Sequence, residues 1–169
     1  MAIITLGANA ITALPAGLGG KVLQVVQATS STTLATTSTS FVDTHLSGSI
    51  TPSSTSSKIY VIANQATQSF NSGGNYGTGR WKIVKTIGGS TTDVTIVSST
   101  SNGNVFAFDY GGSGINIIAM NCLTALVSPS TTSAITFKTQ IALGTNGGNN
   151  VAVNDNLTGG ILIMMEIAG

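Results

Sequence analysis

The residues that could do chemistry in this chain are few and scattered. His45 is the sole histidine, and Asp43 precedes it by two positions, so both side chains would lie on one face of a strand. A protein metal site needs three or four ligands, and no second histidine or acidic cluster supplies the others. We therefore expect no metal and no cofactor, and we interpret His45 as an ordinary polar residue on an exposed strand face.

Catalytic arrangements have equally little support. Twenty serines and one histidine leave a Ser–His–acid arrangement open on numbers alone, but no Gly-x-Ser-x-Gly sequence occurs. A glycoside hydrolase needs a pair of carboxylates, and only sequence-distant pairs exist here. The acidic residues are Asp43, Asp93, Asp109, Asp155 and Glu166. We expect no enzymatic activity, and a small hydrolase acting on glycans is the alternative.

A glycine-rich stretch at residues 73–79 contains Asn75 and Tyr76. It has neither the Gly-Lys-Ser/Thr ending of a phosphate-binding loop nor a following helix pattern. We interpret it as an exposed loop, the kind of segment in which binding residues tend to lie. Residues 111–114 and 147–150 are similar, and in a sandwich some of these loops should cluster at one end.

The elements that must position these residues are strands. Only 7% of the 169 residues are charged, while 25 Thr, 20 Ser, 13 Asn and 21 Gly fill the polar positions. Such a composition favours strands joined by tight turns. The apolar and alternating runs predict strands at 21–28, 41–50, 58–63, 80–87, 92–97, 104–110, 114–127, 134–143 and 160–168. An Asn-Gly turn at 101–104 predicts a hairpin between the strands at 92–97 and 104–110. These short strands predict a β-sandwich or barrel.

Three strand residues or runs carry more specific expectations. The apolar run 114–127 predicts a buried strand, and within it Cys122, the sole cysteine, is expected to be a small buried hydrophobe. The continuous apolar run at the C-terminus predicts a central position in a sheet. Glu166 lies inside that run. We expect it to face solvent, and burial with a partner is the alternative.

Charge bounds the partners. The formal net charge is +1, so no basic field exists to attract a nucleic acid. So weakly charged a surface repels its own copies little, which suits a protein that assembles. No apolar run is long enough to cross a bilayer, and we expect no membrane insertion. One cysteine allows no intrachain disulfide, which fits synthesis in a reducing cytoplasm.

The first 19 residues differ from the rest of the chain. They are uncharged and apolar, and Pro15 with its neighbouring glycines interrupts any regular element. We interpret residues 1–19 as an anchoring arm and residues 20–169 as the β-sandwich domain. The arm's large aliphatic side chains are the expected partner-binding residues: Ile3, Ile4, Leu6, Ile11 and Leu14.

A recognisable pattern begins at residue 20. It has Gly-Lys-Val-Leu-Gln-Val-Val at 20–26, a Thr/Ser-rich stretch ending in Ser-Phe-Val-Asp at 40–43, and Ser-Ile-Thr-Pro-Ser-Ser-x-Ser-Ser-Lys-Ile at 49–59. Residues 79–83 and 159–167 fit its later part. The pattern resembles segments of virion surface proteins of tailed phages, marine and cyanophage-type ones especially. It covers about half of the chain and leaves residues 66–78 and 99–156 uncovered.

The resemblance implies a module of the head-decoration or tail-fibre type and transfers no catalytic residue. It implies an architecture similar to the jelly-roll trimers of the tumour-necrosis-factor and complement-globular class, in which a terminal apolar strand lies near the three-fold axis. The combined prediction is a jelly-roll-like β-sandwich with an extended N-terminal arm. It would act as a homotrimeric decoration or cement protein on the virion surface, bound to the major capsid protein or another virion protein. The alternative is the receptor-binding tip of a tail fibre, with a host surface receptor as partner.

Overall fold

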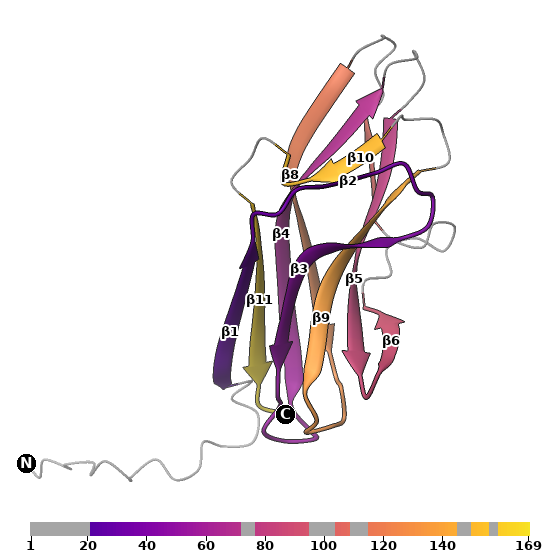
Figure 1. The fold of residues 1–169 in the computed structure, drawn as a ribbon. Coiled ribbons are helices and arrows are strands. Elements are labelled where there is room, and N and C mark those ends of the chain that lie inside the picture. The colour runs from indigo at the N-terminus through magenta and orange to yellow at the C-terminus, as the bar shows by residue number, and fades with distance from the viewer. Residues whose placement is uncertain (1–20, 72–76, 95–103, 109–114, 145–149, 156–158) are drawn as a thin grey trace, which may run out of the picture.

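The computed structural model describes residues 21–71, 77–94, 104–108, 115–144, 150–155 and 159–169 (Figure 1). Over these residues the chain forms β-strands in two antiparallel sheets that pack together. The described part of the chain offers no helix that could cross a bilayer. The predicted all-β sandwich is therefore confirmed. The proposed arm, residues 1–19, lies outside the described residues.

The larger sheet, sheet A, contains six strands. They are β1 (Val22–Ser30), β2 (Leu34–Thr36), β4 (Lys58–Asn71), β8 (Ile115–Val127), β10 (Asn150–Val153) and β11 (Gly160–Ile167). β4 is the long central strand. β11 and β10 pair with successive parts of β4 along one edge, and β8 pairs with its whole length along the other. β1 pairs with β11 and β2 pairs with β10.

The smaller sheet, sheet B, contains five strands. They are β3 (Val42–Ile50), β5 (Gly77–Ile87), β6 (Ser90–Asp93), β7 (Asn104–Phe108) and β9 (Ile135–Leu143). β9 pairs with β3 on one side and with β5 on the other. β6 and β7 both pair with β5, along different parts of its second edge. The predicted hairpin between residues 92–97 and 104–110 is therefore wrong for the described residues, because each strand finds its partner in β5.

The longer strands alternate between the two sheets along the chain. Their spatial orders are β1-β11-β4-β8 in sheet A and β3-β9-β5-β7 in sheet B. These orders are compatible with a jelly roll, which stays a prediction. The C-terminal strand β11 lies between β1 and β4, so the predicted central position is confirmed.

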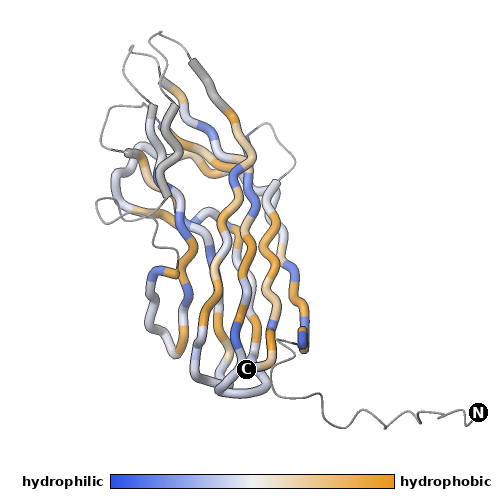
Figure 2. The backbone as a smooth tube through the Cα atoms, turned by 180° about the vertical axis from the view of Figure 1, so that it is seen from behind, coloured by the Kyte–Doolittle hydropathy of each residue, from blue (hydrophilic) through white to orange (hydrophobic). Residues whose placement is uncertain are grey.

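Alternation along the strands builds the core between the sheets. In β9, Ile135, Phe137 and Ile141 are fully buried, whereas Thr136 and Lys138 point to the other side and are partly exposed. Apolar residues recur in the same way along the neighbouring strands (Figure 2). β3 keeps this alternation through an irregularity, because residues 44–46 oppose the single residue Thr139. Two extra residues leave Thr44 and Leu46 pointing inward.

Three strand predictions need correction. β4 continues eight residues beyond the predicted end at Ala63, because its polar second half also pairs on both edges. β8 is not a buried strand: among the described elements it pairs only with β4, so it lies at an edge. β2 and β10 were not predicted, since a strand of three or four residues is too short to show periodicity.

The two ends of the sandwich differ in what the chain does there. β1 begins at one end, where Val22 pairs with Ile167. Three connections between consecutive strands lie outside the described residues: 72–76 between β4 and β5, 109–114 between β7 and β8, and 145–149 between β9 and β10. The pairs Asn71–Ile115, Gly77–Phe108 and Gly79–Leu143 show that the strands flanking these connections end together, at the end opposite the start of β1 (Figure 1).

The core makes a direct prediction for Phe137→Ala. Phe137 is fully buried in the core cluster, and its truncation leaves a cavity that the packed sheets cannot close. We expect the free energy of unfolding to fall by about 3–5 kcal/mol, measured by urea denaturation at fixed protein concentration. The control Thr92→Ala, on exposed β6, should change it by less than about 0.5 kcal/mol. Equal effects of the two substitutions would contradict this account of the core.

Candidate functional site

The expected binding residues lie outside the described part of the chain. This holds for the arm residues Ile3, Ile4, Leu6, Ile11 and Leu14, and for Asn75 and Tyr76 of the glycine-rich stretch. Their roles stay predictions. In sequence, Asn75 and Tyr76 belong to the segment between β4 and β5.

His45 and Asp43 lie on the outer face of sheet B. His45 is exposed and has a φ of 65°, within the irregular part of β3. Asp43 instead binds Lys138, with Oδ2 2.7 Å from Nζ, and accepts a hydrogen bond of 2.8 Å from Gln140. Burial alone would raise the pKa of Asp43, but the hydrogen bonds from Lys138 and Gln140 lower it overall. Among the described residues no three metal-ligating side chains of His, Cys, Asp or Glu come together.

A second charged group on sheet B surrounds Phe41. Lys82 lies 4.1 Å from the centre of the Phe41 ring and binds Asp93 with an Nζ–Oδ1 distance of 2.7 Å. Arg80 lies over the same ring at 5.1 Å. Lys82 is only 9% exposed, and its charge is matched by the partly exposed carboxylate of Asp93 and by the face of the Phe41 ring. These charges hold β5, β6 and the start of β3 together.

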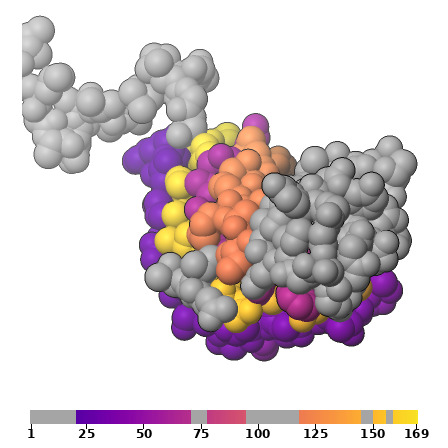
Figure 3. Space-filling model, turned by 90° about the horizontal axis from the view of Figure 1, so that it is seen from above, coloured from indigo at the N-terminus to yellow at the C-terminus, as the bar shows by residue number. Residues whose placement is uncertain are grey.

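The outer face of sheet A has the opposite character. Six large apolar side chains are exposed, and all belong to its two flanking strands, β1 and β8: Val22 48%, Leu23 42%, Val25 59%, Ile118 37%, Met120 55% and Leu126 58%. Between them, β11 and β4 present further side chains that are half-buried: Ile161, Ile163, Met165, Tyr60 and Ile62. Figure 3 shows β1, β11 and β8 at the surface on one side of the molecule. We call these eleven residues the apolar face.

The register explains how one face collects so many apolar side chains. Met165 lies between Val25 on β1 and Tyr60 on β4, and Tyr60 in turn lies beside Leu126 on β8. Each strand contributes the residues that alternate with its core positions. β11 is therefore apolar on both sides: Leu162 and Met164 are fully buried in the core, while Ile161, Ile163 and Met165 face outward.

Cys122 belongs to the same surface. It lies on β8 beside Asn64, two residues from Met120, and is exposed. The prediction that Cys122 is buried is therefore wrong for this chain by itself. The apolar run around it made burial the natural interpretation, but an apolar run does not say whether a strand is covered by its own fold or by another molecule.

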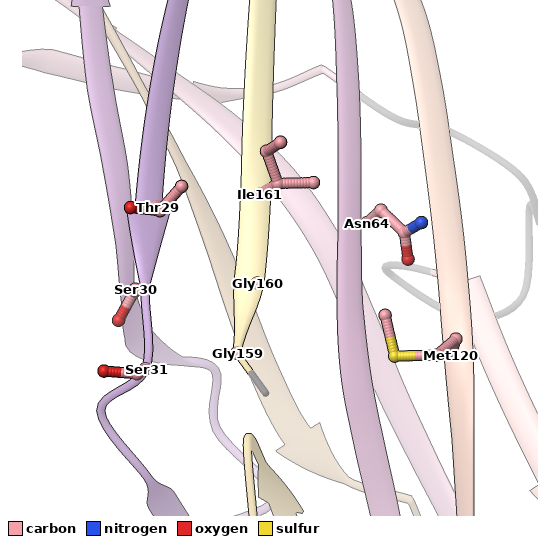
Figure 4. Close-up of a pocket in the computed structure, with 8 residues that line it drawn as sticks. All are labelled: Thr29, Ser30, Ser31, Asn64, Met120, Gly159, Gly160 and Ile161. Carbon is pink, nitrogen blue, oxygen red and sulfur yellow. The ribbon is translucent and has the colours of Figure 1, made fainter. Parts of the chain in front are cut away.

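A notch of about 360 Å³ interrupts the apolar face. Figure 4 shows Thr29, Ser30 and Ser31 of the β1 side opposite Asn64 and Met120, with the Gly159-Gly160 start of β11 between them. Gly159 has a φ of 100°, and a Cβ there would lie 2.6 Å from the carbonyl oxygen of Ser30, so only glycine fits. The notch therefore places the small hydroxyl side chains of Thr29, Ser30 and Ser31 beside an otherwise apolar surface.

Glu166 lies at the opposite end of β11 and is fully buried. Its Oε1 accepts hydrogen bonds of 2.7 Å from both the backbone N–H and the hydroxyl of Ser53, and its Oε2 accepts one of 2.6 Å from Gln24. Gln24 also donates to the carbonyl oxygen of Thr51 at 2.7 Å. The expected exposure of Glu166 is wrong, and the alternative of burial with partners describes it. The carboxylate ties β1 and β11 to the segment between β3 and β4.

These contacts change the acidity of Glu166. Burial acts to raise its pKa, because it penalises the charged form. The nearby Ser57 hydroxyl and the hydrogen bonds from Gln24 and Ser53 outweigh burial and lower the pKa of Glu166 to about 2 from its ordinary value of 4.5. The geometry shows hydrogen bonds to the carboxylate from Gln24 and Ser53, and none from Ser57. The carboxylate is therefore ionised at neutral pH.

The depressed pKa of Glu166 predicts a pH-dependent contribution to stability. A lowered folded-state pKa stabilises the protein above pH 4.5, and this stabilisation is lost as the pH falls toward about 2. In Glu166→Gln we expect a loss of about 1.5–3 kcal/mol in unfolding free energy at pH 7, because charged hydrogen bonds become neutral ones. Urea denaturation between pH 7 and pH 2.5 should show the difference from wild type shrinking below pH 4.5. A constant difference would contradict the assignment.

Comparison with known proteins adds no assignment to this geometry. No protein-family model matches the chain, and no curated protein matches it either.

Proposed function

We propose that this chain is a non-enzymatic structural protein of a tailed-phage virion, a homotrimer that decorates and stabilises the capsid. Its partners would be its own copies and the major capsid protein or another virion protein, on the surface of a particle assembled in the host cytoplasm. The observation that carries the proposal is the exposed apolar face. Sheet B holds two ion pairs, Lys82 with Asp93 and Lys138 with Asp43, whereas sheet A leaves large aliphatic groups in water.

The direction of the sandwich supports the attachment role of the arm. Lys21 enters β1 at one end, and the segments 72–76, 109–114 and 145–149 leave the described strands at the other. A protein anchored through residues 1–19 would therefore hold these glycine-rich segments away from its anchor. The resemblance at residues 20–63 supports a virion protein by a separate route.

The alternative is the receptor-binding tip of a tail fibre. The same three connections favour it, because the strands that flank them end together at one end of the sandwich. The first connection, residues 72–76, includes Asn75 and Tyr76. Copy number separates the two proposals. Quantitative mass spectrometry of purified particles should find hundreds of copies for a decoration protein and tens or fewer for a fibre tip.

The arm is tested by removing residues 1–19. Its five large aliphatic side chains gain about 1.5–3 kcal/mol each on full burial, against about 1–2 kcal/mol for ordering each residue. Backbone pairing with the partner and simultaneous binding of three arms would supply the remainder. We expect the truncated protein to stay folded and oligomeric but to fail to bind particles that lack this protein, measured by co-sedimentation.

A full-length variant provides the matched control for the truncation. Replacing Ile3, Ile4 and Leu6 by serine keeps the arm's length and removes part of its apolar surface. We expect binding intermediate between wild type and the truncation. If the truncated protein still decorated particles at full occupancy, attachment would lie on the sandwich and the arm's role would be wrong.

A further inference from the structure

We infer that the apolar face is the surface through which copies of this chain join, so that the neighbouring copies of the trimer cover β1, β11, β4 and β8. This inference rests on the proposed homotrimer and assigns its interface. Among the described residues, every large apolar side chain that is exposed lies on β1 or β8, at the two sides of this face. The opposite sheet shows no such side chain in the described part of the chain.

Charge favours a second copy over a charged partner. The four strands contain two charged residues, Lys58 and Glu166. Glu166 points inward and is buried, and Lys58 lies at the very start of β4, at the margin of the face. No charged residue occurs from 110 to 137, the stretch that includes all of β8. A charged partner would leave its charges unpaired here, whereas another copy presents an equally uncharged surface.

The size of the face suits a subunit interface. Four strands spaced by about 4.8 Å, with about eight residues each at 3.3 Å, cover roughly 500 Å² in flat projection. The relief of the side chains makes the accessible area larger than this projection. A specific interface buries about 800 Å² on each partner, so the face is of the order of one such interface.

The edge strand β8 points to the same occupant. In the described part of the chain it pairs only with β4, which leaves the backbone along its other side without a strand partner. Natural edge strands are usually protected by lysine, proline or a bulge. β8 has none of these over its 13 residues, and its pairing with β4 is regular throughout. Closure of a few copies around a symmetry axis would cover such an edge and limit further growth.

The decisive substitutions add a charge on one of the two flanking strands of the face, β8 or β1. Leu126 and Val25 are more than half exposed in the single chain, so Leu126→Glu and Val25→Glu should fold. In the assembled protein, each would bury an unpaired charge. We expect either variant to weaken association about 100-fold or more. Thr92→Glu places the same charge on an exposed strand of sheet B and should leave association unchanged.

The native thiol of Cys122 provides a second readout, the rate at which it reacts with a maleimide. It is exposed on the chain and lies on β8 beside the apolar face. In the full-length wild-type protein we expect slow reaction with a maleimide, because a neighbouring copy covers the thiol. In Leu126→Glu and Val25→Glu we expect the fast reaction of an open thiol. Circular dichroism at each step verifies that the variants are folded.

Light scattering and sedimentation at micromolar concentration complete the test. Wild type and Thr92→Glu should have about three times the chain mass of 17.0 kDa, and the face variants should approach 17.0 kDa. If wild type is a trimer and both face variants stay trimeric with fast Cys122 labelling, this interface is wrong while the homotrimer stands. If wild type is a monomer, both are wrong. If removal of residues 1–19 alone yields a monomer, the arm and not the sandwich joins the copies.

Discussion

The buried carboxylate of Glu166 holds together the end of the sandwich at which β1 begins and β11 ends. A charge without water must find its hydrogen bonds inside the protein, and here they come from Gln24 and Ser53, which are far away in sequence. The residues that meet at this carboxylate lie in the stretches 20–26, 49–59 and 159–167, which belong to the sequence pattern behind the proposed virion role. The serine, glutamine and apolar residues of these stretches have a physical role within this fold: they join the first strand, the last strand and one connecting segment.

The two sheets solve the problem of a weakly charged chain differently. Sheet B pairs Lys82 with Asp93 and Lys138 with Asp43, with Lys82 stacked on Phe41, and so presents charged groups on its outer surface. Sheet A has apolar residues on both sides of β11, one set for the core and one set facing outward. A strand with two apolar sides separates folding from association, because one side is satisfied within the chain and the other remains available.

Much of this fold could be predicted from the residues, and the failures share a cause. Alternation located the long strands, and the apolar C-terminal run gave the central place of β11. The same reasoning misplaced β8 and Cys122, because an apolar run indicates burial without saying by what. It also led to the wrong expectation that Glu166 is exposed, because its partners Gln24 and Ser53 are more than 100 residues away in the sequence. No local signal could have found the apolar face, which exists only when four strands from distant parts of the chain are placed in register.

The strands that flank three connections end together at one end of the sandwich, and this has a consequence for how the sequence of such a protein can vary. Their flanking residues, such as Asn71 with Ile115 and Gly77 with Phe108, are held by strand pairing. Length and sequence between these anchor points can change without altering the core, the apolar face or the Glu166 contacts at the far end. The body is thus a display scaffold: insertions between those strands would alter what is presented and leave the architecture below them intact.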